Sequence, residues 1–295
     1  MKYLLTGAYG FLGRHILGSL QGADVITLGR RPENDIACSL GESVPSLPVV
    51  DVVIHCAGKA HVVPKTAEEG EEFYKVNTEG TKNLLKALDA LSERPKQFIL
   101  ISTVSVYGLD SGQLISETHP LLGTSPYAKS KILAEKAVLA WAAENMVPIV
   151  VLRLPLLIGS NPPGNLDKMI NGIKNGRYAS INGGRARKSM VLAVDVANLI
   201  PNLIGRTGIY NLTDRCHPSF NELERKISDI LKTKIHFKLP LKLVSILAVI
   251  GDKFSFFPVN SALIDKMTLD LTFDDSKAAD ELKWAPNKVL NADFL

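Results

Sequence analysis

The sequence predicts an α/β protein with a doubly wound parallel sheet and a smaller, discontinuous C-terminal lobe. Apolar runs rich in β-branched residues alternate with segments of helical periodicity, which is the pattern of βαβ units. The runs are continuous in hydrophobicity, as in strands that are covered on both faces. Three glycines, Gly7, Gly10 and Gly13, follow the first run and open the first helical segment.

Six apolar runs are expected to form strands, and the segments between them helices. The strands are expected at 3–7, 24–29, 50–57, 96–103, 147–154 and 208–213, and the helices at 11–20, 68–91, 127–145 and 193–204. After Leu154 the alternation stops. Residues 155–165, rich in Pro, Gly and Asn, are expected to form a loop, followed by a helix at 166–176 and a basic loop at 183–188.

This change of rhythm predicts the domain organisation. We expect a dinucleotide-binding domain over residues 1–160, to which 189–215 returns, and a substrate-binding lobe made of 161–188 and 216–295. The apolar stretch 239–251 contains Lys242 and is shorter than the roughly 20 residues that a membrane helix needs. We therefore expect a buried or docking helix there and no membrane span.

Composition excludes several classes of function. The net charge of +4 is too small to indicate nucleic-acid binding. Cys38, Cys56 and Cys216 are widely spaced and odd in number, which argues against disulfides or a zinc site and is typical of a reducing cytoplasm. Because no His, Cys, Asp or Glu cluster has the spacing of metal ligands, we expect no metal.

The glycine turn predicts a Rossmann-type dinucleotide site. Gly7 would let the chain turn sharply out of the first strand, Gly10 would allow a pyrophosphate to approach, and Gly13 would let the helix pack closely on the sheet. The first helix would offer free N–H groups and its positive dipole end to the phosphates. An ordinary turn before a helix is the alternative, and it is less compatible with this position in a βαβ unit.

The end of the second strand bears on the choice of cofactor. NAD-preferring sites usually have an acidic residue near this point, but here Gly29 is followed by Arg30 and Arg31. Because a guanidinium matches a 2′-phosphate, NADP(H) is favoured over NAD(H). Two solvated loop arginines are the alternative.

Tyr127 and Lys131 lie four residues apart in an expected helix, so they would share a face. This pair is a weak signal by itself. Its context makes it stronger, because Thr103 ends an expected strand, where ligands bind in parallel sheets, and Asn77 lies in the preceding helical segment.

Together these motifs resemble the extended short-chain dehydrogenase/reductase family, the NAD(P)-dependent epimerases and dehydratases of nucleotide sugars. The resemblance covers nearly the whole chain, through TGAYGFLG, NTEGT, STVSVYG, YAKSK, LRLPLLIG and DDSKAADELKWAP. It implies that Tyr127 is the acid/base, with a phenol pKa that must fall about 3 units from about 10. Lys131 would supply the positive charge and bind the nicotinamide ribose. Thr103 would bind the substrate oxygen, and Asn77 would fix the backbone and a water path.

The resemblance also implies the contacts to cofactor and substrate. The cofactor would contact Gly7, Ala8, Tyr9, Gly10, Phe11, Leu12, Gly13, Arg30, Arg31, Cys56, Ala57, Gly58, Ser102, Tyr127, Lys131, Pro155 and Ile158. The substrate would contact His61, Thr103, Ser105, Asn165, Leu166, Arg187 and Lys188. For His55, a hydrogen-bonded core histidine is the favoured interpretation, whereas for His61 a substrate contact and a structural role are equally open.

The residues after Thr103 separate the branches of this family. Relatives that eliminate water from a hexose have Thr-Asp-Glu here, whereas this chain has Thr103-Val104-Ser105, and valine cannot donate a proton to a leaving hydroxyl. Two activities remain, 4-epimerisation with retained NAD and reduction of a 4-keto sugar, and Arg30-Arg31 favours the reductase. Lys188 stands where relatives have an arginine for the diphosphate, and a UDP-sugar is the expected substrate; a solvated basic loop is the alternative.

Two other classes of function remain open. A non-catalytic NADP-binding sensor is one, although such proteins usually lose the Tyr–Lys pair. An oxidoreductase for a non-sugar alcohol is the other, and it would have no affinity for UDP. The helices at 68–91 and 127–145 could form a four-helix homodimer contact, as in relatives.

Overall fold

The computed structural model describes residues 1–182, 185–240, 242, 244, 248, 264 and 268–295. Among these residues, seven parallel strands form one sheet in the order β11-β7-β5-β4-β1-β2-β3. The strands are β1 (Lys2–Thr6), β2 (Asp24–Gly29), β3 (Ile36–Ala37), β4 (Val52–His55), β5 (Gln97–Thr103), β7 (Ile149–Leu154) and β11 (Gly208–Asn211). The predicted doubly wound α/β sheet is therefore confirmed.

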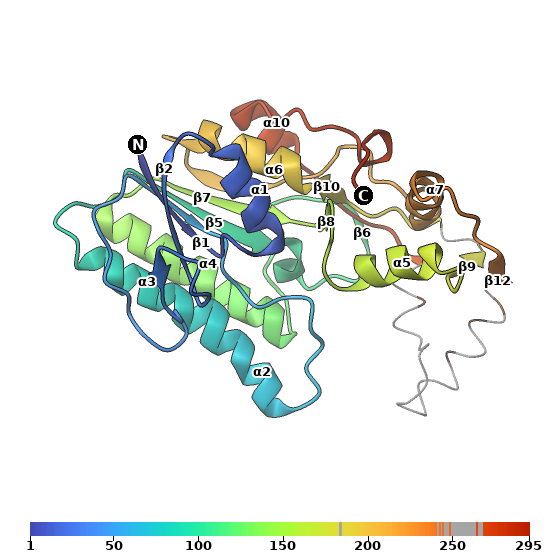
Figure 1. Ribbon diagram of the computed structural model, residues 1–295, viewed down its shortest axis with the longest axis horizontal. Coiled ribbons are helices and arrows are strands. Elements are labelled where there is room, and N and C mark those ends of the chain that lie inside the picture. The colour runs from blue at the N-terminus through green and yellow to red at the C-terminus, as the bar shows by residue number, and fades with distance from the viewer. Residues whose placement is uncertain (183–184, 241, 243, 245–247, 249–263, 265–267) are drawn as a thin grey trace.

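Helices cover both faces of this sheet (Figure 1). Above it in the view lie α1 (Phe11–Ser19), α6 (Ala193–Leu199) and α10 (Ser276–Leu282), and below it α2 (Ala67–Phe73), α3 (Gly80–Asp89) and α4 (Pro126–Asn145). Neighbouring strand residues enter different cores: Leu4 packs with Leu84 and Val138, whereas Leu5 packs with Ile16 and others on the opposite face. Both faces are buried, which explains why the strands are continuously apolar.

The strand order places the ligand-binding edge. The chain runs outward from β1 to β2 and β3, then returns to the other side of β1 to form β4, β5, β7 and β11. The order thus reverses between β1 and β4. In open α/β sheets, ligands bind outside the carboxyl ends of the strands at such a point. The turn after β1 and the segment after β4 therefore flank the expected cofactor position.

The helix expected over 68–91 is not uniform. It comprises α2, a π-helical segment at Tyr74–Glu79, and α3. Thr66 begins α2 by accepting a hydrogen bond from the N–H of Glu69. Because π-helical turns frequently occur at functional sites, the position of Asn77 inside this segment is notable.

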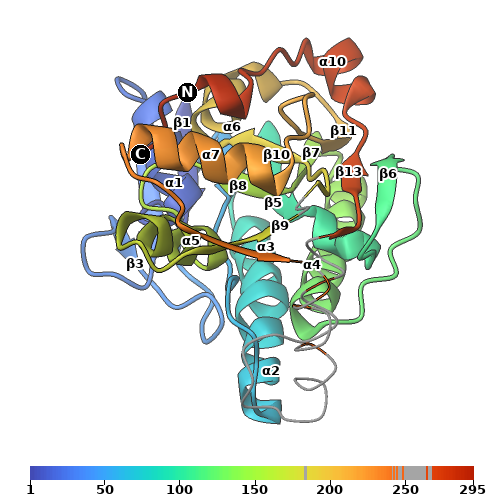
Figure 2. The same cartoon turned by 90° about the vertical axis from the view of Figure 1, so that its right-hand side faces the viewer.

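The C-terminal lobe lies beyond the carboxyl ends of the central strands (Figure 2). It contains α5 (Asn165–Lys174), α7 (Phe220–Ile230) and the strand pair β9 (Ala179–Asn182) with β12 (Phe237–Pro240). Two further parallel pairs adjoin it, β8 (Leu156–Ile158) with β10 (Met190–Leu192) and β6 (Gly112–Ile115) with β13 (Leu271–Phe273). Of these strands, β6, β8 and β10 lie in the ranges expected for the dinucleotide-binding domain. The expectation of a loop over 155–165 was wrong in part, because residues 156–158 form the strand β8. This strand pairs with β10, more than thirty residues later in the chain, and no local pattern reveals such a pairing.

The helix expected over 239–251 starts on residues that belong to β12, Leu239 and Pro240, and otherwise lies mostly outside the described residues. In the part of the chain that the structure describes, no helix has the length and apolar character needed to span a membrane.

Candidate active site

The turn from β1 into α1 requires glycine at two positions. Gly7 has a φ of +72°, and a Cβ atom there would lie 2.7 Å from the backbone N of Ala57. A Cβ atom at Gly13 would lie 2.0 Å from the carbonyl oxygen of Gly7, so the helix can approach the turn only without a side chain. Gly10 caps α1 with its N–H bound to the Gly7 carbonyl at 2.9 Å and makes no side-chain cap, which leaves first-turn N–H groups for a ligand.

A cavity of about 310 Å³ opens beside this turn. Of the predicted cofactor contacts, it brings together Gly7, Ala8, Tyr9, Gly10, Arg30, Arg31, Cys56, Ala57 and Gly58. It extends from the glycine turn past the end of β2 to the π-helical segment, where Lys75 forms an ion pair of 2.8 Å with Glu42. A cavity lined by the glycine cradle and by two arginines has groups that suit the phosphates of a dinucleotide.

The remaining predicted cofactor residues lie outside the lining of this cavity. Leu12 and Ile158 are buried in apolar cores, where Ile158 packs with Leu166 and Met190. Phe11 packs edge-on against His15, with ring centroids 5.6 Å apart. The hydroxyl of Ser102 donates to Glu135, and Pro155 lines a second cavity.

The phenol of Tyr127 meets the hydroxyl of Thr103 at the carboxyl end of β5. Ser125 positions the tyrosine by capping α4, its hydroxyl accepting from the N–H of Ala128 at 3.1 Å. The Tyr127 ring packs edge-on against Phe73 with centroids 6.0 Å apart. Burial raises the pKa of Tyr127, and the hydrogen bond with Thr103 opposes that rise. The expected lowering of this pKa is therefore wrong for this arrangement, because burial has a larger effect than the hydrogen bond with Thr103.

Lys131 lies one turn further along α4 and is 6% exposed. Its ammonium donates a hydrogen bond of 2.6 Å to the carbonyl oxygen of Ile101 on β5. Burial lowers the pKa of Lys131 to about 8, with the charge of Glu135 opposing this fall. The ammonium also faces Cys56, which lines the first cavity.

Asn77 ties the segment after β4 to α4. Its amide oxygen accepts from the backbone N–H of Lys59 at 2.7 Å, and its amide nitrogen donates to the carbonyl of Lys59 at 3.1 Å and the hydroxyl of Ser130 at 2.9 Å. Ser130 directly precedes Lys131. Asn77 thus joins the backbone of Lys59 to the Ser130 hydroxyl on α4, as a positioning residue would.

The two histidines have different surroundings. His55 lies between the hydroxyls of Thr6, at 2.7 Å, and Thr81, at 2.9 Å, and burial lowers the pKa of this imidazole to about 3. It is a neutral core histidine, as favoured from the sequence. His61 is exposed, has a φ of +63°, and lies beside Gly164 at the start of α5.

A second cavity, of about 510 Å³, lies between the sheet and the C-terminal lobe. Of the predicted substrate contacts, it brings together Ser105, Asn165, Leu166 and Lys188. Its lining also includes Ser125 and Ala128, which flank Tyr127 in the chain, and Val104, which follows Thr103. Most of the rest is apolar, and includes Met169, Phe220, Leu223, Leu271 and Phe273. These apolar residues are more than 40 residues from Tyr127 in the sequence, so no local signal could have placed them here.

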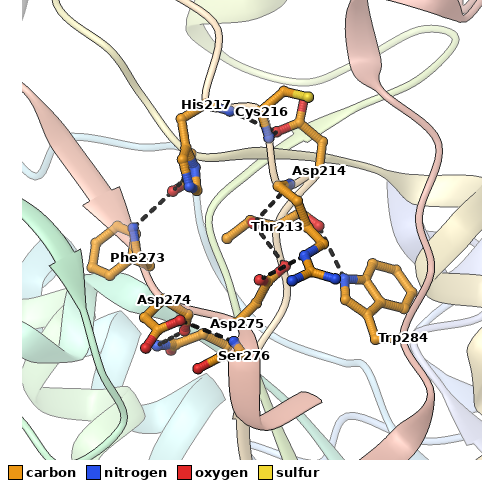
Figure 3. Close-up of polar contacts among 12 residues, drawn as sticks. Thr213, Asp214, Cys216, His217, Phe273, Asp274, Asp275, Ser276 and Trp284 are labelled. Carbon is orange, nitrogen blue, oxygen red and sulfur yellow. Dashed lines mark hydrogen bonds and ion pairs between the residues drawn. The ribbon is translucent and has the colours of Figure 1, made fainter. Parts of the chain in front are cut away.

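A polar network around Asp214, His217 and Phe273 (Figure 3) adjoins the second cavity, whose lining includes Phe273. The wall residue Ser189 accepts from the backbone N–H of Phe273 at 2.8 Å, and its hydroxyl contacts the ring of His217 at 2.9 Å. Asp214 accepts the backbone N–H groups of Cys216 and His217 at 3.1 and 3.0 Å. These contacts join the segment after β11 to β13 and give the cavity a fixed wall.

Thr213, Asp275 and Trp284 continue this network (Figure 3). Asp275 accepts from the hydroxyl of Thr213 at 2.8 Å and pairs with Arg215 at 3.5 Å, while the indole of Trp284 donates to the Thr213 carbonyl at 3.0 Å. Arg187 donates to the carbonyl of His217 at 3.2 Å and is exposed, so the structure directs it away from the cavity. The predicted substrate contact of Arg187 is therefore not brought into the site, whereas that of Lys188 is.

Comparison with known proteins identifies the family of the chain. The sequence model of the NAD dependent epimerase/dehydratase family matches residues 3–212. The chain is similar to a UDP-glucose 4-epimerase of Vibrio cholerae, with 28% identity over 99% of this chain and 92% of the relative.

Solved structures share the fold. UDP-N-acetylglucosamine 4-epimerase from Methanobrevibacter ruminantium M1, in complex with UDP-N-acetylmuramic acid, superposes with a TM-score of 0.76 at 20% identity, covering 98% of this chain and 93% of the other. RMD from Pseudomonas aeruginosa, complexed with NADPH, superposes with a TM-score of 0.71 at 22% identity, covering 98% and 96%.

Proposed function

The chain belongs to the NAD dependent epimerase/dehydratase family and is an NAD(P)-dependent enzyme of the extended short-chain dehydrogenase/reductase type, and we propose that it acts at C4 of a UDP-linked sugar. The reaction is reduction of a 4-keto group, with Tyr127 as the acid/base. One observation carries this proposal. The Tyr127–Thr103 hydroxyl pair adjoins residues of the 510 Å³ cavity, while Lys131 faces Cys56 in the 310 Å³ cavity.

Each cavity has the chemistry of its ligand. The glycine cradle and the free N–H groups of α1 would hold the dinucleotide phosphates, and Arg30 and Arg31 would favour a 2′-phosphate. Asn165 and Leu166 would contact the nucleotide of the substrate, and Lys188 its diphosphate, as a point charge. The nicotinamide, when bound, supplies the hydride that reduces the keto carbon. Residues 161–188 and 216–295 would form the substrate lobe.

The protein's own groups move the proton. The phenol of Tyr127 would donate its proton to the sugar oxygen as that oxygen gains electrons, with Thr103 holding the same oxygen by a second hydrogen bond. Because burial raises the pKa of Tyr127, the phenol is protonated and ready to act as an acid near neutral pH. That state suits reduction. The Lys131 ammonium would stabilise the phenolate that remains.

Residues next to Thr103 disfavour dehydration. Val104 lines the substrate cavity where an elimination would need an acid, and Ser105 contributes a hydroxyl bound by Thr103 at 3.2 Å. Neither of the two residues that follow Thr103 carries a carboxyl group, and the carboxylate that lines this cavity belongs to Asp110, seven residues further along the chain. A UDP-hexose 4-epimerase is the alternative, favoured by the similarity to the Vibrio cholerae enzyme. It would retain NAD through the whole cycle, whereas a reductase would exchange NADPH.

The test measures turnover and binding separately. Purified protein is incubated with UDP-4-keto sugars and NADPH, and with UDP-glucose alone, and products are identified by mass spectrometry. Tyr127→Phe should lower kcat by about 10²–10⁴-fold and leave the Kd for the dinucleotide unchanged. The control is Tyr3→Phe, which alters a tyrosine in β1 at the end away from the glycine turn. It should leave both kcat and the Kd for the dinucleotide unchanged. Wild-type conversion of UDP-glucose without added cofactor would favour the epimerase, and the absence of turnover on any UDP-sugar would favour a sensor.

A further inference from the structure

Three residues spaced four apart on α4 meet three consecutive residues of β5. Tyr127 contacts the side chain of Thr103, the ammonium of Lys131 donates to the carbonyl of Ile101 at 2.6 Å, and Glu135 accepts from the hydroxyl of Ser102. Residues at positions i, i+4 and i+8 lie along one face of a helix. Glu135 therefore extends the line of the two family residues by one further turn.

The Glu135 carboxylate is buried between α4 and the strands β5 and β7. Its carboxylate accepts from Arg153 on β7, with Nη2 at 2.7 Å and Nε at 3.3 Å. The side chains of Arg153 and Glu135 are 3% and 1% exposed. Ser102 and Arg153 are direct partners across the β5–β7 ladder, so both reach the carboxylate from neighbouring strands.

The remaining donors of Arg153 are also engaged. Its Nη1 donates to the phenol of Tyr107 at 3.1 Å and to the carbonyl of Glu117 at 3.2 Å, and Tyr107 in turn donates to Asn211 at 2.7 Å. Asn211 is the partner of Arg153 on β11. A pair buried to this extent loses most of its Coulomb energy to desolvation, so stability alone does not explain it.

The groups around Lys131 show what the carboxylate contributes. From β4, burial holds His55 neutral with a pKa of about 3 and the Cys56 thiol protonated with a pKa of about 12. From α4 itself, Tyr127 is protonated and Glu135 carries a charge that opposes the burial-driven fall in the Lys131 pKa. From β5, Ile101 contributes a carbonyl dipole. Among these neighbours, Glu135 is the carboxylate that stabilises the ammonium.

We propose that Glu135 is a positioning residue for the reaction proposed above: it keeps Lys131 charged beside Tyr127 and, through Ser102, holds the end of β5 that carries Thr103. Arg153 fixes the position of this carboxylate through two hydrogen bonds, from Nη2 at 2.7 Å and from Nε at 3.3 Å. The inference rests on the proposed function only for its kinetic consequence, because the charge state of Lys131 is a property of the protein alone.

The primary test titrates Lys131 directly. Protein labelled with ¹³C and ¹⁵N at lysine is followed by NMR against pH, and the Lys131 signal is assigned by its loss in Lys131→Met. The wild-type signal should titrate near pH 8. In Glu135→Gln the midpoint should fall by about 1 unit or more, because the facing negative charge is removed. Glu144→Gln, an exposed glutamate on the same helix, is the matched control and should not move it.

Two further variants guard against a misfolded product. Glu135→Asp retains the carboxylate and should restore most of the wild-type midpoint. Glu135→Gln combined with Arg153→Met removes the buried guanidinium together with its carboxylate partner, and should still show the lowered Lys131 midpoint. An unchanged Lys131 midpoint in both the single and the double variant would overturn the proposal and leave Glu135 as a structural residue.

The kinetic readout separates this proposal from the proposed function. With a working substrate, the alkaline limb of kcat/KM should move to lower pH in Glu135→Gln by the same amount as the NMR midpoint. A limb that stays in place while the NMR midpoint moves would refute the catalytic half of the inference. Wild-type protein that turns over no UDP-sugar would refute the proposed function, while the Lys131 titration would still decide the role of Glu135.

Discussion

The carbonyl oxygen of Gly7 lies so close to Gly13 that a methyl group at residue 13 would meet it at 2.0 Å. This contact joins the end of β1 to the first turn of α1. The N–H of Gly10 binds the same carbonyl at 2.9 Å. The shape of the candidate phosphate cradle thus depends on one oxygen atom that both glycines approach.

Replacing Gly13 with alanine should displace α1 from the turn and destabilise the protein. We expect a loss of about 1–3 kcal/mol in the free energy of unfolding, as for overpacking of a core, together with weaker dinucleotide binding. Urea unfolding and fluorescence titration would measure the two effects. Gly18→Ala in the same helix is the control, because nothing lies within 4 Å of its Cβ position, and it should stabilise the protein slightly.

Arg30 and Arg31 should discriminate between the two dinucleotides. Both line the first cavity beyond β2, where a 2′-phosphate would lie. Replacing both with alanine should weaken NADPH binding by about 10-fold or more, because a charge-assisted hydrogen bond contributes about 1.5–3 kcal/mol. NADH binding should change little. Arg177→Ala, an exposed arginine after α5, is the control, and equal losses for both dinucleotides would contradict the assignment.

Neighbouring residues Lys188 and Arg187 form a matched pair for the substrate cavity. Lys188 lines the cavity, whereas Arg187 donates outward to the carbonyl of His217. Lys188→Met should weaken UDP binding by about 10-fold, since a charged contact to the diphosphate is lost. Arg187→Met should have less than about a twofold effect. Calorimetric titration with UDP measures both, and the reverse order of effects would show that the diphosphate lies elsewhere.

Stability should fall in acid because of His55. The folded pKa of this histidine is about 3, below its ordinary value of 6.5. Between these values the unfolded chain binds a proton that the folded protein does not. Lowering the pH from about 6.5 toward 3 should therefore reduce the free energy of unfolding by up to about 1.4 kcal/mol per pH unit.

His55→Gln tests this acid dependence. The variant should lose part of the slope of unfolding free energy against pH, measured by urea unfolding at several pH values. Glutamine can hydrogen-bond to both threonine hydroxyls without taking up a proton. His236→Gln, which alters an exposed side chain, should retain the wild-type slope. An unchanged slope in His55→Gln would mean that other groups dominate acid unfolding.

The sequence pattern predicted the sheet well, because strands and the glycine turn are each marked by residues that lie close together in the chain. The strand of residues 24–29 has the same bounds in β2, and the glycine turn lies where the pattern placed it. Each of these features depends on residues within about ten positions of one another. Lys131 and Tyr127 share a face for the same reason, since helix periodicity alone brings them together.

Other parts of the site depend on contacts between distant segments. The π-helical segment around Asn77 and the short strand β8 have no distinctive local pattern, because their stability comes from Ser130 on α4 and from β10. The protonation of Tyr127 also differed from expectation. Burial between α2 and β5 raises the phenol pKa, and sequence spacing contains no measure of burial.

The sequence by itself determined the doubly wound sheet, the dinucleotide cradle after β1, and the Tyr–Lys pair on one helical face, because hydrophobic periodicity and glycine geometry act over short stretches of chain. Only the tertiary structure decided that Lys188 rather than Arg187 enters the second cavity and that Glu135 meets Arg153. Those outcomes depend on how strands and helices far apart in the chain pack, and therefore on burial and charge in three dimensions.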